Sequence, residues 1–322
     1  MTIRNILILM QVKGIGPAFF KKNRAKLLHT NDIITFIRDN LSESSLSLQQ
    51  LGEKADEIIN RCQLLGIQIV SYLSDDYPPM LLEINDPPPI IYLKGNTSLL
   101  HKAIIAIIGT RKSTFLGNSI ASRVGEYFAD EYAICNGLVE GIDEHSVFCE
   151  GVARKNTIGI LSGGLNFEFT CSNKLSQKAQ SVLSTGGLII SEFPPDKKED
   201  QYSAAKSSRL QAGLSQGIIL IQSKIDGGSK YALTTFAQLP RTLGIIHYPS
   251  ASEYQEDDFE ANRLIVQEQR KGIADITQKK IERIQLNSII TITNKSDYEL
   301  FKVSMVNSNN SNNKDQTSRL LF

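Results

Sequence analysis

From residue 103 onward, short apolar runs alternate with longer amphipathic segments, and this alternation limits the fold more than any other feature of the chain. The run 103–108 is apolar throughout and ends at Gly109, which is typical of a strand buried on both faces. Further strands are predicted at 132–135, 157–161, 188–190, 218–221 and 243–247. The repeated spacing predicts an α/β fold, a Rossmann-like doubly wound sheet that is mainly parallel.

Helices are expected between these strands, near 117–130, 144–154, 173–184, 206–214 and 229–238, with a last helix at 262–276. Two extended segments, at 67–73 and 90–93, precede the alternating region, and the proline-rich stretches between them exclude helix. We therefore assign residues 67–276 to the Rossmann-like domain.

Residues 1–66 are expected to form a small helical domain of the helix-hairpin-helix or SAM-like type. Gly14-Ile15-Gly16 followed by Pro17 predicts a tight turn between two helices, because Pro is favoured in a first helical turn. Residues 1–30 contain six Lys or Arg and no Asp or Glu, and N–H groups at a helix start can hold phosphate. This segment therefore has two alternative roles: it contacts DNA, or it is a structural helical cap whose basic face is solvated.

Residues 277–322 are expected to be a C-terminal extension without a winged helix. The run 307–313 contains only Asn and Ser. Because such a run cannot bury apolar surface, it is predicted to be a disordered tail.

The composition argues against several classes of protein. Lys and Arg number 35 against 34 Asp and Glu, a formal net charge of +1, so any nucleic-acid binding must depend on a local patch. The four cysteines have no CxxC spacing, which argues against zinc, and no metal or cofactor is expected. No apolar run reaches the roughly 18 residues of a membrane span, so we expect a cytoplasmic protein without membrane contact.

The loop after the first long strand is the first candidate site, because ligands of doubly wound sheets bind at the carboxyl ends of the strands. Gly109 allows a tight turn there, and Arg111, Lys112 and Ser113 carry groups that suit phosphate. The sequence has no Walker motif, and this loop has no GxGxxG fingerprint. The next predicted strand also does not end in an acidic residue that could hold a ribose. A nicotinamide dehydrogenase and a P-loop ATPase are thus disfavoured, and a surface ion pair is the alternative role of Arg111.

The next loop contains Gly137 and Gly141 on either side of a turn that leads to Asp143. We interpret Asp143 mainly as a residue that caps the following helix. No constellation for hydrolysis stands out, since His145 is only two residues from Asp143 and the other histidines are scattered.

Two later loops complete the candidate site. Gly163 and Gly164 follow one strand, and Gly228, Ser229 and Lys230 precede a helix whose N–H groups could hold an anion. The alternative is that these glycines serve only the turns.

The order and spacing of these loops resembles the DprA/Smf (DNA-processing protein A) family over about residues 6–276. The matching segments are Tyr77-Pro78 through Asp86-Pro87-Pro88 to Gly95, Ile108-Gly109-Thr110-Arg111, Gly137 to Asp143, Ser191-Glu192-Phe193-Pro194, Ala212-Gly213-Leu214-Ser215, and Gly227-Gly228-Ser229 through Arg241. No single segment is specific, but their shared order is, and the chain is identified as a diverged member.

Several positions that line the single-stranded-DNA site in the family differ here. The family's Phe-Pro-x-Arg-Asn-Arg segment aligns with 204–209, where only Arg209 is kept and Lys206 is a substitute charge. Val147 stands where the family usually has His, and Asn136 and Val139 replace a Ser and an Ala. Weak DNA binding is therefore expected.

The resemblance implies a non-enzymatic, homodimeric protein that binds and protects single-stranded DNA. It also implies that the protein promotes loading of a RecA-type recombinase in DNA uptake, transformation and recombination. Arg111, Lys206, Arg209 and Lys230 would hold phosphates. One alternative is a degenerate Rossmann-like interaction or defence module. The other, a nucleotide-derivative hydrolase or sensor, is disfavoured because residues 227–232 lack the catalytic Glu of related phosphoribohydrolases.

Overall fold

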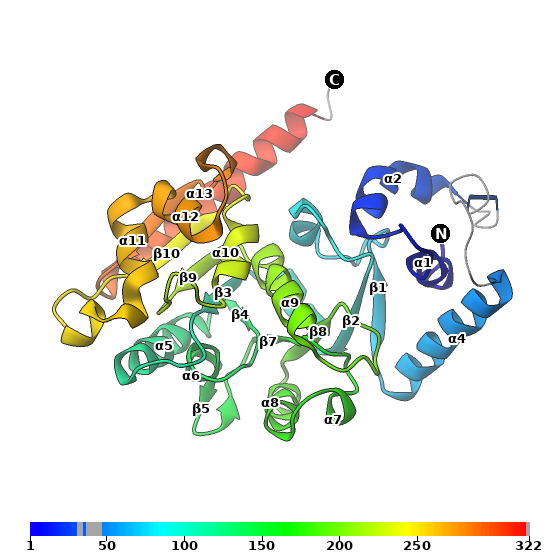
Figure 1. The fold of residues 1–322 in the computed structure, drawn as a ribbon, viewed down its shortest axis with the longest axis horizontal. Helices are drawn as coiled ribbons and strands as arrows, with labels where there is room; N and C mark the ends of the chain where they lie inside the picture. Colours follow the sequence, from blue (N-terminus) through cyan, green and yellow to red (C-terminus); the bar gives the residue numbers. More distant parts are fainter. Residues whose placement is uncertain (31–34, 37–46, 320–322) are drawn as a thin grey trace.

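The computed structural model describes residues 1–30, 35–36 and 47–319, with side chains as far as residue 308. A nine-stranded sheet runs through this described part of the chain, and helices cover both of its faces (Figure 1). The strands are β1 (Gln68–Ser71), β2 (Ile90–Gly95), β3 (Ile104–Ile108), β4 (Ala133–Asn136), β7 (Thr157–Ile160), β8 (Leu188–Ser191), β9 (Gly217–Leu220), β10 (Thr242–Ile246) and β11 (Ser288–Ile292).

The strand order in the sheet is β1-β2-β8-β7-β4-β3-β9-β10-β11. All neighbours from β8 to β11 are parallel, while β2 is antiparallel to both β1 and β8. The mainly parallel, doubly wound fold is thus confirmed. The chain passes outward from β3 through β4, β7 and β8, then returns to β9 on the other side of β3. This reversal between β3 and β9 creates the crevice where such folds bind ligands.

The helices that follow these strands are largely where the alternating pattern predicts them. They are α5 (Phe115–Phe128), α6 (Ile142–Val147), α7 (Phe167–Thr170), α8 (Asn173–Ser184), α9 (Gln201–Leu214), α10 (Lys230–Phe236), α11 (Glu260–Glu268) and α12 (Arg270–Thr277). The helix expected at 144–154 is wrong in its second half, where the chain forms a hairpin of β5 (Phe148–Cys149) and β6 (Val152–Ala153). The helix expected at 262–276 is two helices, because Gln269 breaks it with a φ of 52°.

The N-terminal helices are α1 (Ile3–Met10), α2 (Pro17–His29) and α4 (Leu48–Leu64). Gly14, with a φ of +89°, lies in the turn between α1 and α2, as the helix-hairpin-helix pattern predicts. Helices α1 and α4 pack on β1 at one end of the sheet (Figure 1). The domain boundary at residue 66 stays a prediction, and positions 31–34 and 37–46 of that predicted domain lie outside the described residues.

The C-terminal extension differs from its expected form. Strand β11 joins the sheet beside β10, and helix α13 (Ser296–Arg319) then returns across β10 and β11. The run 307–313, expected to be disordered, continues the backbone of α13. The helix is held at its start by Phe301 and Met305, whose side chains are buried against Gly217 of β9. These contacts order the helix through tertiary packing, which the polar composition of its later turns does not reveal.

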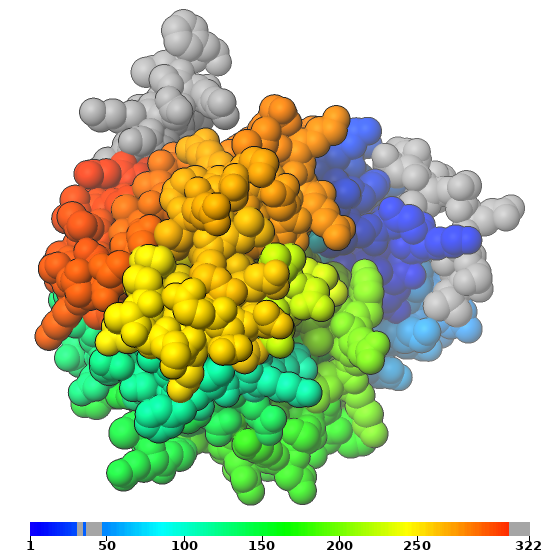
Figure 2. Space-filling model, turned by 60° about the vertical axis from the view of Figure 1, so that its left-hand side comes forward, coloured from blue at the N-terminus to red at the C-terminus, as the bar shows by residue number. Residues whose placement is uncertain are grey.

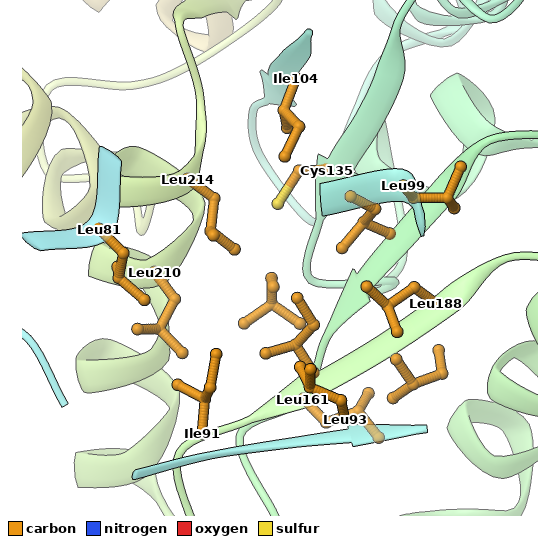
Figure 3. Packing of buried hydrophobic residues seen from close by; sticks show 14 of the residues in the cluster. Leu81, Ile91, Leu93, Leu99, Ile104, Cys135, Leu161, Leu188, Leu210 and Leu214 are labelled. Carbon is orange, nitrogen blue, oxygen red and sulfur yellow. The ribbon is translucent and has the colours of Figure 1, made fainter. Parts of the chain in front are cut away.

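The main apolar core lies between the sheet and its covering helices. Ile91 and Leu93 of β2 point toward Leu210 of α9 and Leu161 beyond β7 (Figure 3). These side chains are at most 1% exposed, so their burial contributes strongly to stability. No helix in the described part of the chain is both long and apolar enough to cross a membrane.

Candidate nucleic-acid interface

A cavity of about 520 Å³ lies at the reversal point of the sheet, and we call it the switch-point cavity. Loops that follow β3, β4, β7 and β9 line it, through residues 109–112, Gly137, Ser162 and Gly228 respectively. Ser207, Ser208 and Gln211 of α9 also line it. The prediction that these glycine-bearing loops gather at one edge of the sheet is confirmed, because the strands before them are parallel neighbours.

Asp143 lies in this cavity and is 5% exposed. Burial raises the pKa of its carboxyl group to about 7, against the opposing effect of backbone N–H donors from Gly137 and Val139. The bond from the Gly137 N–H to Oδ2 measures 2.8 Å. Asp143 therefore holds the turn after β4. The prediction that it caps the following helix is wrong, because Asp143 lies inside α6, whose N-cap residue is Gly141.

Arg111 and Lys112 are exposed and line the cavity from the loop after β3. Across the described residues, neither side chain forms an ion pair within 4.0 Å. The carboxylate of Glu192, one partner that Arg111 could have taken, is occupied by Arg209 and Lys206. Two cationic side chains are thus available at the cavity mouth.

Gly141 determines how closely the loops after β3 and β4 approach each other. Its φ of +78° lies in the left-handed region, and a Cβ atom there would collide with the carbonyl oxygens of Thr110 and Arg111. The Ile142 N–H donates to the Thr110 carbonyl at 3.2 Å. Gly141 therefore serves the packing of the loop that presents Arg111.

The expected place of Arg209 in the crevice is wrong. Arg209 is 5% exposed, and its guanidinium pairs with Glu192 and, through Nε, with Asp86 Oδ2 at 2.8 Å. Lys206 Nζ lies 3.3 Å from Glu192 Oε2, and neither cation is among the residues that line the cavity. The physical reason is the buried Glu192, because a carboxylate removed from water requires cationic partners.

Five further candidates also lie outside the cavity lining: Ser113, Gly141, Gly163, Gly164 and Lys230. Ser113 donates to Asn118, and Lys230 lies 5.7 Å from the centre of the Tyr231 ring. A Cβ atom on Gly164 would collide with the carbonyl oxygens of Pro194 and Pro195. The Gly163–Gly164 pair thus allows the chain to pack on the loop after β8, rather than allowing a ligand to approach.

Sequence reasoning missed the aromatic side chain in the cavity. Tyr231, 47% exposed, lines it from the first turn of α10, next to Gly228 and Ser229. Tyr231 directly follows the Gly-Gly-Ser-Lys loop in the sequence, and this position could have indicated that its ring lies at the candidate site. Asn136 and Val147, by contrast, are buried, and Asn136 donates to the Asp143 carbonyl and to Ser146.

Residues with metal-ligating side chains are dispersed in this structure. Across the described residues, no group of three or more His, Cys, Asp or Glu is placed to hold a metal ion.

Comparison with known proteins points to one family. The model of the family described as "DNA recombination-mediator protein A" matches residues 68–284. The chain is 29% identical over 221 residues to the DNA processing protein DprA of Bacillus subtilis, covering 67% of this chain and 73% of that protein. It is 30% identical to DprA of Streptococcus pneumoniae, over 49% of this chain and 55% of that one. Protein Smf of Escherichia coli is 31% identical, over 48% and 41% respectively.

Two solved structures share the fold. DNA processing protein A from Streptococcus pneumoniae superposes with a TM-score of 0.70 and 20% identity, covering 92% of this chain and 96% of that chain. DNA processing protein A from Helicobacter pylori, described for its single-stranded-DNA binding mode, gives a TM-score of 0.52 and 21% identity. That match covers 63% of this chain and 88% of the Helicobacter pylori chain.

Proposed function

Since this chain belongs to the DNA recombination-mediator protein A family, we propose that it binds single-stranded DNA in the switch-point cavity. The observation that carries the proposal is the pair Arg111 and Lys112, exposed at the cavity mouth without an ion-pair partner in the described part of the chain. A guanidinium group without an ion-pair partner can take a phosphate in a bidentate manner, and a lysine adds a second charge. The Helicobacter pylori relative, named for single-stranded-DNA binding, supports this ligand.

Tyr231 supplies the second element of the proposed site. Its ring is partly exposed beside the glycine loop after β9, so a base can stack on it. Stacking on an aromatic ring contributes about 1–3 kcal/mol per base in proteins that bind single strands. The site thus combines phosphate contacts at Arg111 and Lys112 with one stacking surface.

Binding should nevertheless be weak. Arg209 and Lys206 are committed to Glu192, which leaves fewer cations for phosphate than the sequence suggests. Asp143 adds a carboxyl group inside the cavity, and anions bind less well beside it when it is ionised. Both reasons for weak binding arise from buried acidic side chains, Glu192 and Asp143, and not from the arrangement of the strands.

The test is a fluorescence-anisotropy titration of labelled oligo(dT) at several salt concentrations. Arg111→Ala should raise the Kd about tenfold or more, because a hydrogen bond to a charged group contributes about 1.5–3 kcal/mol. It should also flatten the slope of log K against log salt by about 0.7, the value for one phosphate contact on a single strand.

Lys102→Ala is the matched control, because Lys102 is exposed just before β3. It therefore lies at the amino ends of the parallel strands, whereas the cavity lies at their carboxyl ends. Wild-type affinity and salt slope in Arg111→Ala would refute the assignment of the cavity. The basic helix α2 would then be the next candidate for DNA contact.

We also propose that the protein passes its strand to a RecA-type recombinase, which the description of the family as a recombination mediator supports, and that it does so as a homodimer, as the family resemblance implies. In a strand-exchange assay with DNA coated by a single-strand-binding protein, addition of this protein should shorten the lag before recombinase filaments form. Arg111→Ala should lose that effect in proportion to its loss of DNA affinity. Sedimentation of the free protein tests the dimer.

We propose that the protein has no catalytic activity, although one observation favours a second candidate, hydrolysis of a nucleotide derivative. Asp143, with a pKa of about 7, is a carboxyl group in a ligand-sized cavity. Its oxygens, however, accept hydrogen bonds from the N–H groups of Gly137 and Val139. This commitment to the local turn makes binding the better-supported function.

A further inference from the structure

A second cavity, of about 500 Å³, lies beyond the ends of β10 and β11, and we call it the outer cavity. Its walls come from α5 between residues 120 and 127, from the ends of β10 and β11, from Tyr248 after β10, and from residues 293–295 and Tyr298 around the start of α13. It shares no lining residue with the switch-point cavity. The segment that follows β10 lies between α5 and the C-terminal part of the chain (Figure 2), and it contributes Tyr248 to one cavity and Asp258 to the other.

Three tyrosines line the outer cavity: Tyr127, Tyr248 and Tyr298. Tyr127 and Tyr298 already contact each other, with ring centres 4.8 Å apart. Tyr248 is different, because it is 40% exposed and, among the described residues, its side chain has neither a ring contact nor a hydrogen bond. A partly exposed aromatic ring without a ring contact is a surface on which a planar group can stack.

Two cations line the same cavity. Arg123 is exposed and bonds only to Ser119, with Nη2 3.1 Å from Oγ, and Lys295 lies 5.5 Å from the centre of the Tyr127 ring. Neither has a carboxylate within 4.0 Å in the part of the chain that the structure describes. Glu126 is the one acid that lines the cavity, so the two cations outnumber it. Asp297 and Glu299 accept hydrogen bonds from the lining residues Thr293 and Tyr127 but are not in the lining themselves, which therefore favours a ligand with a negative charge.

We propose that the outer cavity binds one nucleotide unit, with the base on Tyr248 and the phosphate between Arg123 and Lys295. A planar base and an anionic phosphate in one ligand match a free aromatic ring beside two unpaired cations. A cavity of this volume falls within the range of small-ligand sites. The nucleotide is either free or part of a DNA strand, and the inference does not rest on the proposed function of the switch-point cavity.

The test uses the full chain with four probes: dTMP, thymidine, inorganic phosphate and oligo(dT). Calorimetric titrations should show dTMP or oligo(dT) binding at least about fivefold more weakly to Tyr248→Ala, the loss expected for one stacked base. Tyr248→Phe should retain wild-type affinity, because it keeps the ring. Arg123→Ala and Lys295→Ala should weaken dTMP toward the level of thymidine, whereas Lys102→Ala should not.

The outcomes separate the two sources of the nucleotide. If the substitutions weaken the binding of dTMP alone, the ligand is a free nucleotide. If they weaken the binding of oligo(dT) alone, the ligand is a DNA strand that reaches both cavities. Each measurement is repeated in the Arg111→Ala background, where the effect of Tyr248→Ala should persist. Unchanged affinity of all probes in Tyr248→Ala and in Lys295→Ala would overturn the inference, whatever Arg111→Ala does. An effect of Arg111→Ala alone would leave only the switch-point cavity as a binding site.

Discussion

Replacement of Arg209 by methionine should destabilise the protein without removing its DNA affinity. Arg209 is on α9, and its guanidinium contacts Glu192 after β8 and Asp86 in the proline-rich segment before β2. It also donates to the carbonyl oxygens of Asp86 and Lys206. The side chain thus joins three segments that are far apart in the sequence.

The expected cost follows from the burial of the pair. The side chains of Arg209 and Glu192 are 7% and 3% exposed, so methionine at 209 would leave Glu192 largely desolvated, with Lys206 as its remaining cation. Removing one partner of such a buried pair costs about 3–5 kcal/mol. A protein of ordinary stability has about 5–15 kcal/mol in total, so the loss should be evident in the unfolding midpoint.

Urea denaturation followed by far-ultraviolet circular dichroism measures this loss. Glu192→Gln and the double variant Arg209→Met/Glu192→Gln complete a double-mutant cycle. The double variant should lose at least about 1 kcal/mol less than the sum of the single losses, because it leaves no buried charge at position 192. The affinity of folded Arg209→Met for oligo(dT), measured at low temperature, should equal that of the wild type.

The opposite pattern would refute this reasoning. If Arg209→Met keeps wild-type stability within about 1 kcal/mol but loses DNA affinity, Arg209 contacts phosphate despite its partners. The ion pair with Glu192 would then open when DNA binds, and the role that the sequence suggested for Arg209 would be restored.

Three further predictions concern the switch-point cavity and the packing of α5. Affinity for oligo(dT) should rise about four- to eightfold from pH 8 to pH 6, because the carboxyl group of Asp143 gains a proton as the pH falls through about 7 and the loss of one nearby negative charge is worth roughly 1–2 kcal/mol. Asp143→Asn should remove that dependence. Gly125→Ala should lose about 1–3 kcal/mol of unfolding free energy, because its Cβ atom would collide with the Ser146 carbonyl, whereas Gly228→Ala, which meets no atom within 4 Å, should change little. Incubation with nucleoside monophosphates or NAD should release no product by chromatography, and product formation that Asp143→Asn abolishes would favour the hydrolase.

The arrangement of the sheet was readable from the sequence because it depends on local pattern. A run such as Ile104–Ile108 can be soluble only when both of its faces are covered, and Gly109 after it permits the turn that follows. Parallel neighbours then bring the loops after β3, β4 and β9 to one edge, whatever their sequences. The place of Arg111 at the cavity follows from these two facts.

Helix α9 shows where local pattern is insufficient. It begins at Gln201, five residues before the predicted start, because Asp200 and Ser203 form a capping box that the polar sequence around them obscures. The break at Gln269 likewise depends on close packing, since a Cβ atom on Gly272 would lie 2.6 Å from the Leu264 carbonyl oxygen. Both boundaries depend on contacts that hydrophobic periodicity does not report.

Only the tertiary structure determines whether each cationic side chain pairs within the protein or stays available for a ligand. Arg111, Arg209 and Arg241 all lie at positions where the family also has Arg, yet among these three only Arg111 lines the cavity. Arg209 pairs with Glu192, and the fully buried Arg241 donates to the carbonyl oxygens of Ala212 and Ser215. A charged side chain takes the nearest acceptors when it leaves water, and those acceptors come from segments that the sequence separates. The sequence alone therefore determined which loops meet, while long-range pairing determined which of their charges remain free for a ligand.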